Sequence, residues 1–374
     1  MSELPLLAAR VRDRFRSEGP GGDPRDVLRQ WIAVEAPLLS AGDTTELVDR
    51  IHALVAGLGP LEPLCADPDV TDVLVNGPGT VWVERNGRLE PTDITIDAEE
   101  IAVVVERILG PLGIRVDRAR PIADGRLADG SRISVVAPPI ALDGTVMSIR
   151  RFTARRLPLE SFASAEVVEL VDELLDRRAN IVIFGGTGSG KTTLLNSLAA
   201  RLPRSERIVT VEDAAELRLG GDHVVRLESR PANAEGVGAI SMRELVRAAL
   251  RLRPDRIVVG EVRGPEALEM LWSMSSGHDG SLSTCHASSG LDVLFRLETF
   301  VLLAGAELPL AAVRAQVRAA VDAVIGIVRL PDGRRVVREV SEVPHDPGAE
   351  HPRPLVRDGR LIGAPTRSRR WADR

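Results

Sequence analysis

The sequence predicts an α/β protein in which a C-terminal domain with a parallel sheet follows a smaller α+β domain. From about residue 161 onward, apolar strand-like runs alternate with amphipathic helical patterns, as they do in parallel sheets. A glycine-rich loop stands between one of these strands and the helix that follows it. The first half of the chain instead carries two hairpin signals, Asn86-Gly87 and Asp129-Gly130, which are typical of antiparallel strands.

Composition and pattern divide the chain into five segments. Residues 1–23 are charged and end in a Gly/Pro-rich stretch, so we expect a mobile arm. An α+β domain with a helical start is expected over 24–152, and a short linker over 153–160 follows it. The parallel-sheet domain is expected over 161–343. The Pro- and Arg-rich remainder, 344–374, is expected to be a disordered tail.

Charge and cysteine content exclude several classes of protein. The 374 residues include 48 basic and 54 acidic side chains, for a formal net charge of -6. This balance argues against nucleic acid or anionic lipid as the main partner. Two cysteines, Cys65 and Cys285, cannot build a disulfide framework or a four-cysteine zinc site within one chain. The charged N-terminus and the absence of a long apolar stretch predict a cytoplasmic protein with no transmembrane segment.

The glycine-rich loop follows the apolar strand 181–184 and matches the P-loop pattern G-x-x-x-x-G-K-[ST]. Glycines allow backbone N–H groups to converge on phosphate oxygens, and the N-terminus of the following helix adds partial positive charge. Lys191 is the only lysine among the 48 basic residues, and it stands where an ammonium must reach the β- and γ-phosphates. The expected nucleotide-binding residues are Gly185, Gly186, Thr187, Gly188, Ser189, Gly190, Lys191, Thr192 and Thr193, with the Thr192 hydroxyl as a Mg²⁺ ligand.

Two carboxylates that follow apolar strands are candidates for the water chemistry. Glu261 ends the run 257–260, at the edge of a parallel sheet that faces ligands, and is our first choice for the general base. Its predecessor is unusual, because Gly260 stands where a metal-binding Asp often stands. Glu212 ends strand 208–211 and is a candidate to hold the Mg²⁺ water shell or orient the attacking water. The alternative role for Glu212 is that of a helix-capping acid.

Two histidines flank the predicted strand 281–285. His278 and His286 are candidates to sense the γ-phosphate, although a structural role is equally compatible with a lone histidine. A metal site is a weaker interpretation, because no carboxylate or cysteine pattern completes it.

Taken together, these motifs resemble the ATPase superfamily of type II and type IV secretion systems. The resemblance rests on the glycine loop, an acidic box at 211–214, the run 252–267 with its Gly-Glu pair, and a histidine box that begins at 277. The first domain resembles the CpaF/TadA branch, which powers assembly of tight-adherence (Flp) pili. The segments that carry this second resemblance are 57–64, 75–78, 83–87, 129–132, 138–139 and 148–152.

The resemblance implies a RecA-like C-terminal domain, a hexameric ring and hydrolysis of ATP with Mg²⁺. It also implies a cytoplasmic motor at the inner face of the cytoplasmic membrane, where platform proteins couple it to pilus assembly or protein secretion. Arginines of the first domain are implied to reach the nucleotide, and guanidinium groups do stabilise phosphoryl charge. They are Arg126, Arg132, Arg150 and Arg151, with Arg263 as a further candidate. Gly125 departs from the bulkier residue that is common in the family.

Two other functions would use the same nucleotide core. One is a nucleic-acid-dependent P-loop motor, which the acidic net charge and the 3% aromatic content disfavour. The other is an ATP-binding scaffold that locks a ring without hydrolysis. The presence of Lys191, Thr192 and Glu261 disfavours that scaffold.

Overall fold

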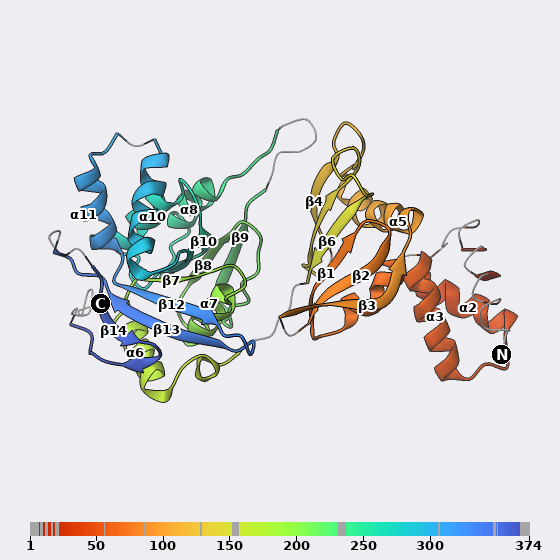
Figure 1. The fold of residues 1–374 in the computed structure, drawn as a ribbon, viewed down its shortest axis with the longest axis horizontal. Coiled ribbons are helices and arrows are strands. Elements are labelled where there is room, and N and C mark those ends of the chain that lie inside the picture. Colours follow the sequence, from red (N-terminus) through yellow and green to blue (C-terminus); the bar gives the residue numbers. More distant parts are fainter. Residues whose placement is uncertain are drawn as a thin grey trace. The chain divides into compact units, whose positions relative to one another are not determined.

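The computed structural model describes residues 22–366 apart from 56, 86, 128, 152–156, 231–236, 306, 347, 348 and 350, together with 7, 10, 11, 14, 15 and 18. The chain forms two compact units, Met1–Thr153 and Ala154–Arg374, which Figure 1 colours red to yellow and green to blue. Each unit has its own core and is described by itself. Much of the expected linker, at 153–156, lies outside the described residues.

The first unit is built on an antiparallel sheet. Its described strands follow the order β3-β2-β1-β6-β5-β4, so β1 and β6 pair at the centre although they are far apart in sequence. β2 pairs with β3, and β4 with β5, as the two hairpin signals predict. The strands are β1 (Val70–Asn76), β2 (Gly79–Arg85), β3 (Arg88–Ile96), β4 (Ile122–Arg126), β5 (Arg132–Val136) and β6 (Val146–Arg150).

Helix α5 (Ala98–Leu109) covers the core of this sheet (Figure 1). It begins at a capping box, in which the Asp97 side chain accepts from the Glu100 N–H and the Glu100 side chain accepts from the Asp97 N–H. Its apolar face packs against buried residues of β1, β2, β5 and β6. Three short helices lie beside this core: η1 (Gly59–Leu61), α4 (Glu62–Ala66) and η2 (Gly110–Leu112).

Helices α2 (Pro24–Glu35) and α3 (Ala41–Val55) form a separate small core ahead of the sheet. Most of the expected mobile arm, 1–23, lies outside the described residues. Leu7, Val11 and Phe15 are nevertheless buried in the small core with α2 and α3. Their spacing of four places them on one face of a helix, so this part of the arm packs because its apolar side chains are in helical register.

The second unit contains a sheet of nine described strands in the order β15-β14-β13-β12-β7-β11-β10-β8-β9. The strands from β12 to β9 are parallel, which confirms the predicted fold class. β13 to β15 extend the sheet in antiparallel fashion. The bounds are β7 (Ile181–Gly185), β8 (Ile208–Glu212), β9 (Val224–Glu228), β10 (Arg256–Val262), β11 (Leu282–His286), β12 (Ala323–Arg329), β13 (Arg335–Glu342), β14 (Arg353–Arg357) and β15 (Arg360–Leu361).

Helices cover both faces of this sheet. Alternate residues of β7 enter different cores, with Ile181 and Ile183 on the side of α6 and α7, and Val182 and Phe184 on the side of α8 to α11. A strand buried on both faces is typical of parallel sheets and explains the continuous apolar run before the glycine loop. The helices are η3 (Leu159–Ser161), α6 (Ala165–Asp176), α7 (Lys191–Ala199), α8 (Met242–Leu250), α9 (Ala267–Ser275), α10 (Gly290–Leu303) and α11 (Leu310–Ala320).

The stretch expected to be a disordered tail differs from that expectation. Two strands, β14 and β15, lie within 344–374. Leu355 and Val356 are buried in the core beside α6, and this burial offsets the cost of ordering the stretch. The Glu342 carboxylate accepts from Arg353 Nε (3.1 Å) and from the Thr366 N–H (2.9 Å). Residues 367–374 lie outside the described part of the chain.

Candidate active site

The glycine loop lies at the carboxyl edge of the parallel sheet, between β7 and α7. β7 is buried throughout and ends at Gly185, and α7 begins at Lys191. Gly190 is the N-cap of α7 and has φ +97°, a left-handed conformation that glycine adopts at little cost. The first N–H groups of α7 have no acceptor within the helix and therefore face the loop. This strand–loop–helix arrangement forms a cradle for phosphate oxygens.

Lys191 is buried inside this loop. Its ammonium donates to the carbonyl oxygens of Gly185 (3.1 Å) and Gly186 (3.0 Å). The same Nζ lies 4.0 Å from Glu261 Oε1, although Glu261 comes from β10. The fold therefore brings together the lysine of the loop and the carboxylate that sequence reasoning chose as the general base.

The two oxygens of Glu261 have different surroundings. Oε1 faces Lys191, whereas Oε2 accepts from Arg263 Nε at 2.8 Å. The Arg263 side chain is largely exposed, so it orients the carboxylate from the solvent side. A carboxylate held in this way, and partly open to solvent, can accept a proton from a water molecule placed next to a phosphate.

Glu212 lies at the end of β8 and is almost fully buried. Its Oε1 accepts from the backbone N–H groups of Glu216 and Leu217, both at 2.8 Å. Burial raises the pKa of this carboxyl to about 7, against the opposing effect of those two hydrogen bonds. Among the described residues, no group donates a hydrogen bond to the buried Oε2. A buried oxygen of this kind indicates a ligand, an ion or an ordered water.

The packing around Glu212 explains the unusual Gly260. A Cβ at position 260 would lie 2.9 Å from Glu212 Cγ and 3.5 Å from its Oε1. The Thr284 hydroxyl donates to the Gly260 carbonyl at 2.8 Å and holds the strand in place. An aspartate at 260 and the observed Glu212 conformation therefore exclude each other, and the carboxylate at this point of the sheet comes from β8 instead of β10.

The structure separates the two candidate histidines. β11 pairs in parallel with β7, with His286 directly opposite Gly185, so His286 lies at the carboxyl edge beside the first residue of the loop. His278 precedes the same strand and therefore lies at the amino edge. The length of β11 separates His278 from the phosphate loop of its own chain.

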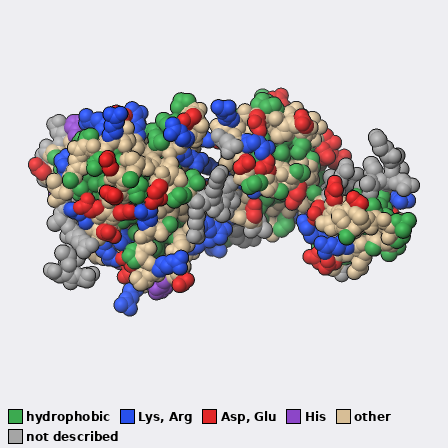
Figure 2. Space-filling model, turned by 90° about the horizontal axis from the view of Figure 1, so that it is seen from below, with side chains coloured by type: hydrophobic (Ala, Val, Ile, Leu, Met, Phe, Trp, Pro, Cys, Tyr) green, Lys and Arg blue, Asp and Glu red, His purple; other side chains and the backbone are tan. Residues whose placement is uncertain are grey.

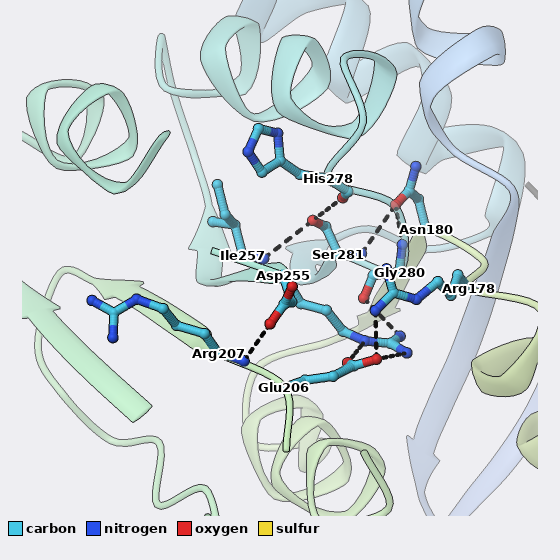
Figure 3. A network of polar contacts seen from close by, with 10 residues as sticks. Arg178, Asn180, Glu206, Arg207, Asp255, Ile257, His278, Gly280 and Ser281 are labelled. Atoms are coloured by element: carbon cyan, nitrogen blue, oxygen red, sulfur yellow. Dashed lines mark hydrogen bonds and ion pairs between the residues drawn. The ribbon is translucent and has the colours of Figure 1, made fainter. Parts of the chain in front are cut away.

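Figure 3 shows that the backbone of His278 belongs to a polar network at the amino edge. Its carbonyl oxygen accepts from Ser281 Oγ at 2.8 Å. Asn180 accepts from the N–H groups of Gly280 (2.9 Å) and Ser281 (3.0 Å) and donates to carbonyl groups in α9 and α11. The buried guanidinium of Arg256 also donates to the Gly280 carbonyl, at 3.2 Å. These bonds join strand starts to helix ends, which is a structural role.

Three of the four candidate arginines of the first unit form a row. Arg126 on β4 is paired with Arg132 on β5, and Arg132 is paired with Arg150 on β6. Directly paired residues project from the same face of a sheet, so the three side chains are neighbours. Asp72 on β1 continues the row as the partner of Arg150. The row therefore places three cations and one acid side by side on one face of the sheet.

Arg151 differs from its neighbour Arg150. Its guanidinium donates to the carbonyl oxygens of Val70 (3.1 Å) and Asp67, and its N–H donates to the Thr71 carbonyl at 2.8 Å. These contacts lie within the first unit and fix the start of β1. The geometry therefore gives Arg151 a structural role and leaves the row to the other three arginines.

The residues expected to hold Mg²⁺ fit that ion. Mg²⁺ prefers oxygen ligands, and it is usually bound by one or two carboxylates together with water and substrate phosphates. The buried Oε2 of Glu212 and the Thr192 hydroxyl in the first turn of α7 are ligands of this kind. In the described part of the chain, no group of three or more His, Cys, Asp or Glu side chains forms a metal cage. The ion is therefore expected to bind together with the nucleotide.

Sequence reasoning missed Arg335, which lies against the phosphate loop. A Cβ at Gly190 would lie 2.5 Å from Arg335 Cδ, and Arg335 Nη1 lies 3.4 Å from Thr193 Oγ1. Arg335 begins β13, far from the loop in sequence. The turn residues Asp332-Gly333 between β12 and β13 are a local hairpin signal. They do not reveal that β12 pairs with β7.

Comparison with known proteins identifies the family. The family model described as "Type II/IV secretion system protein" matches residues 55–362. The chain belongs to this family. As a type II/IV secretion system protein that retains the lysine and threonine of its phosphate loop, it is an ATP hydrolase.

Several named proteins are similar to this family member over most of their length. A protein of Mycobacterium tuberculosis named as a conjugal transfer protein is 39% identical, covering 80% of this chain and 89% of the relative. The type IV secretion system protein PtlH of Bordetella pertussis is 34% identical, covering 81% and 98%. The conjugal transfer protein TrbB of Rhizobium radiobacter is 34% identical, covering 74% and 84%.

Two solved structures share the fold. The pilus retraction motor PilT, solved with ADP, aligns with a TM-score of 0.56 at 20% identity and covers 80% of this chain and 82% of PilT. The ATPase DotB of Yersinia pseudotuberculosis aligns with a TM-score of 0.57 at 19% identity and covers 76% and 78%. Within the described residues, no helix has the length and apolar composition needed to cross a bilayer.

Proposed function

We propose that the chain is a hexameric motor that couples ATP hydrolysis to pilus assembly or protein secretion through inner-membrane platform proteins. The observation that carries the proposal is the 4.0 Å approach of Lys191 Nζ to Glu261 Oε1 at the carboxyl edge of the sheet. It joins a phosphate-binding group to a proton acceptor, which an enzyme needs and a passive nucleotide-binding scaffold does not. The motor would act in the cytoplasm, at the inner face of the cytoplasmic membrane.

The residues of the site have complementary roles in this proposal. Lys191 and the N–H groups of the loop bind the phosphates, and Glu261 accepts the proton of the attacking water. His286, beside Gly185, lies where it can sense the γ-phosphate. Mg²⁺ would be held by the Thr192 hydroxyl and by Glu212, directly or through water, and would neutralise charge on the β- and γ-phosphates.

The row of Arg126, Arg132 and Arg150 supports a role of the first unit in the cycle. Three neighbouring guanidinium groups are a suitable surface for phosphate oxygens. We propose that this surface reaches a nucleotide, so that hydrolysis depends on the first unit. Whether that nucleotide is bound by the same chain or by a neighbour can be decided by mixing Lys191→Ala chains with chains that lack the row.

The tight-adherence branch is the finer part of the proposal. It is supported by the motifs of the first domain, whereas the relatives named above carry conjugal-transfer and type IV secretion names. Deleting the gene in its host separates these possibilities. We expect loss of surface pili and of surface adherence. Intact pili together with loss of DNA transfer or of a secreted protein would assign the chain to another branch.

The surface supports a protein-directed motor over a nucleic-acid motor. On the face drawn in Figure 2, described acidic and basic side chains are interspersed over both units. A nucleic-acid motor needs a basic track that follows the phosphate backbone. We therefore expect single-stranded and duplex DNA to leave ATP turnover unchanged.

The test of the proposed function uses the purified full chain. We expect Mg²⁺-dependent phosphate release from ATP by an oligomer whose mass matches six chains. Lys191→Ala should lose phosphate release, because the compact ammonium is removed from the loop. An oligomer that binds ATP without releasing phosphate would indicate a non-hydrolysing scaffold. Turnover that requires DNA would indicate a nucleic-acid motor.

A further inference from the structure

Two paired arginines lie on the β12–β13 side of the phosphate loop, away from the acidic residues. β12 pairs with β7 on one side, and β11, β10 and β8 follow on the other side. Arg329 at the end of β12 is paired with Arg335 at the start of β13, so their side chains share a face. Both are half-buried. Glu261 and Glu212 lie across the loop, at the ends of β10 and β8.

The Arg335 side chain contacts the point where the loop becomes helix α7. Its Cδ and Nε would lie only 2.5 and 3.0 Å from a Cβ at Gly190, so its stem rests directly on the glycine backbone. Its Nη1 lies 3.4 Å from Thr193 Oγ1, in the first turn of α7. A hydrogen bond of this length is weak, and a charged oxygen would replace it readily.

The order of the strands sets the direction of the nucleotide. The γ-phosphate has to lie between Lys191 and Glu261, because hydrolysis needs both groups. The phosphate chain then runs along the loop toward the start of α7, where backbone N–H groups cradle the α- and β-phosphates. The α-phosphate and the ribose therefore leave the loop on the side of Arg335, opposite to Glu261.

We propose that Arg335, assisted by Arg329, binds the α-phosphate of the nucleotide. The proposal rests on the proposed ATPase function and names a further residue of the same site. Because Arg329 and Arg335 are directly paired and share a face, one anion can contact both guanidinium groups. The guanidinium of Arg335 can also offer two parallel N–H groups to a phosphate, as lysine cannot.

A contact with the α-phosphate has a specific kinetic consequence. ATP and ADP both carry this group, so Arg335 stabilises substrate, transition state and product alike. Such uniform binding lowers KM without raising kcat. Arg335 is therefore an affinity residue, in contrast to Glu261, whose role is confined to the chemical step.

The test is a calorimetric titration of the full chain carrying Glu261→Gln, with Mg-ATP and with Mg-ADP. Adding Arg335→Ala should weaken the binding of both nucleotides by a similar factor of about tenfold to a hundredfold. This is the effect expected from the loss of one charged hydrogen-bonding group. Arg335→Lys should recover part of that loss. The matched control is Arg334→Ala, because exposed Arg334 binds Asp332 in the hairpin turn, with Nε 2.8 Å from Oδ2. The affinity of the control for each nucleotide should stay within about twofold of that of the parent.

Four outcomes overturn the proposal. Unchanged affinity for both nucleotides in Arg335→Ala removes Arg335 from the site while leaving the ATPase function intact. A loss confined to ATP would assign Arg335 to the γ-phosphate. A parent chain that binds neither nucleotide overturns the proposed function and this inference together.

If Arg335→Ala lowers the thermal unfolding midpoint, Arg335→Gln is titrated in its place. ATP turnover is also measured for Arg335→Ala in the chain that retains Glu261. A raised KM at constant kcat supports the assignment, and a lowered kcat contradicts it.

Discussion

The Glu212 side chain occupies the space that a side chain at position 260 would need, with only 2.9 Å between Glu212 Cγ and a Cβ placed on Gly260. Glu212 ends β8, and Gly260 lies near the end of the neighbouring strand β10. We therefore propose that the carboxylate of Glu212, from β8, takes the place of an aspartate on β10.

Gly260→Ala tests this relationship. The added methyl must displace Glu212, so we expect a loss of about 1–3 kcal/mol in the free energy of unfolding and at least a roughly tenfold fall in kcat. Urea denaturation and phosphate release measure the two effects. Gly42→Ala is the matched control, since the nearest atom to its new methyl is Ser40 Oγ at 3.7 Å. Unchanged turnover in Gly260→Ala would show that Glu212 does not need its present position.

Glu261→Gln separates binding from chemistry. The amide keeps the shape of the carboxylate but cannot accept the proton of water, so we expect kcat to fall about a hundredfold or more. Removing a carboxylate 4.0 Å from Lys191 should leave the affinity for ATP equal or higher. The exposed Asp222→Asn serves as the control. Undiminished turnover would remove Glu261 from the role of general base.

The raised pKa of Glu212 predicts a pH dependence of stability. Between the ordinary value of 4.5 and about 7, the folded chain retains a proton that the unfolded chain releases. The free energy of unfolding should therefore fall as pH rises through this window, by up to about 3 kcal/mol.

Glu212→Gln removes that dependence while its amide oxygen can still accept from Glu216 and Leu217. Urea midpoints of the variant should change less between pH 5 and pH 8 than those of the unmodified chain. Parallel curves for the two proteins would contradict the buried, protonated state of Glu212.

The two neighbouring arginines at the end of β6 should respond oppositely to alanine. Arg150→Ala removes a member of the arginine row, so we expect lower ATP turnover with an unchanged unfolding midpoint. Arg151→Ala leaves the carbonyls of Asp67 and Val70 without their donor, so we expect a loss of about 1–3 kcal/mol in stability. Thermal unfolding and phosphate release distinguish them. A stable Arg151 variant with low turnover would reverse the two assignments.

The two histidines provide a further test. His286→Ala should lower kcat, because His286 lies beside Gly185 at the phosphate loop. His278→Ala should leave kcat within about twofold, because the length of β11 separates His278 from the phosphate loop of its own chain. The unfolding midpoint should change little, because the variant keeps the backbone carbonyl that accepts from Ser281 Oγ. Both effects can be measured on the same preparations. A catalytic defect of His278→Ala without loss of stability would place that side chain at a nucleotide held by another chain.

Local features of the site could be predicted from the sequence. The strand, the loop and the helix around Lys191 are consecutive, so spacing and residue type define them. Glu261 was predictable for the same reason, because an apolar strand that ends in a carboxylate is a local pattern. The period of two in β6 also separates Arg150 from Arg151, and the sequence analysis did not use it.

Features that depend on strand order could not be predicted in this way. Glu212 fills the space beside Gly260 only because β8 lies next to β10. The position of Arg335 requires β12 to lie beside β7, and nothing near Arg335 in the sequence reports that pairing. β14 is ordered because Leu355 and Val356 are buried in the core. The Pro- and Arg-rich composition of this stretch gives no sign of that burial.

Lys191 also gives the protein a practical property. It is the sole lysine of the chain, and its buried ammonium is held by two loop carbonyls. Amine-reactive reagents therefore have a single side-chain target, besides the terminal amine. A bound phosphate chain should shield that target. Mass spectrometry of one labelled peptide would then count occupied sites within an intact assembly, without any engineered reporter.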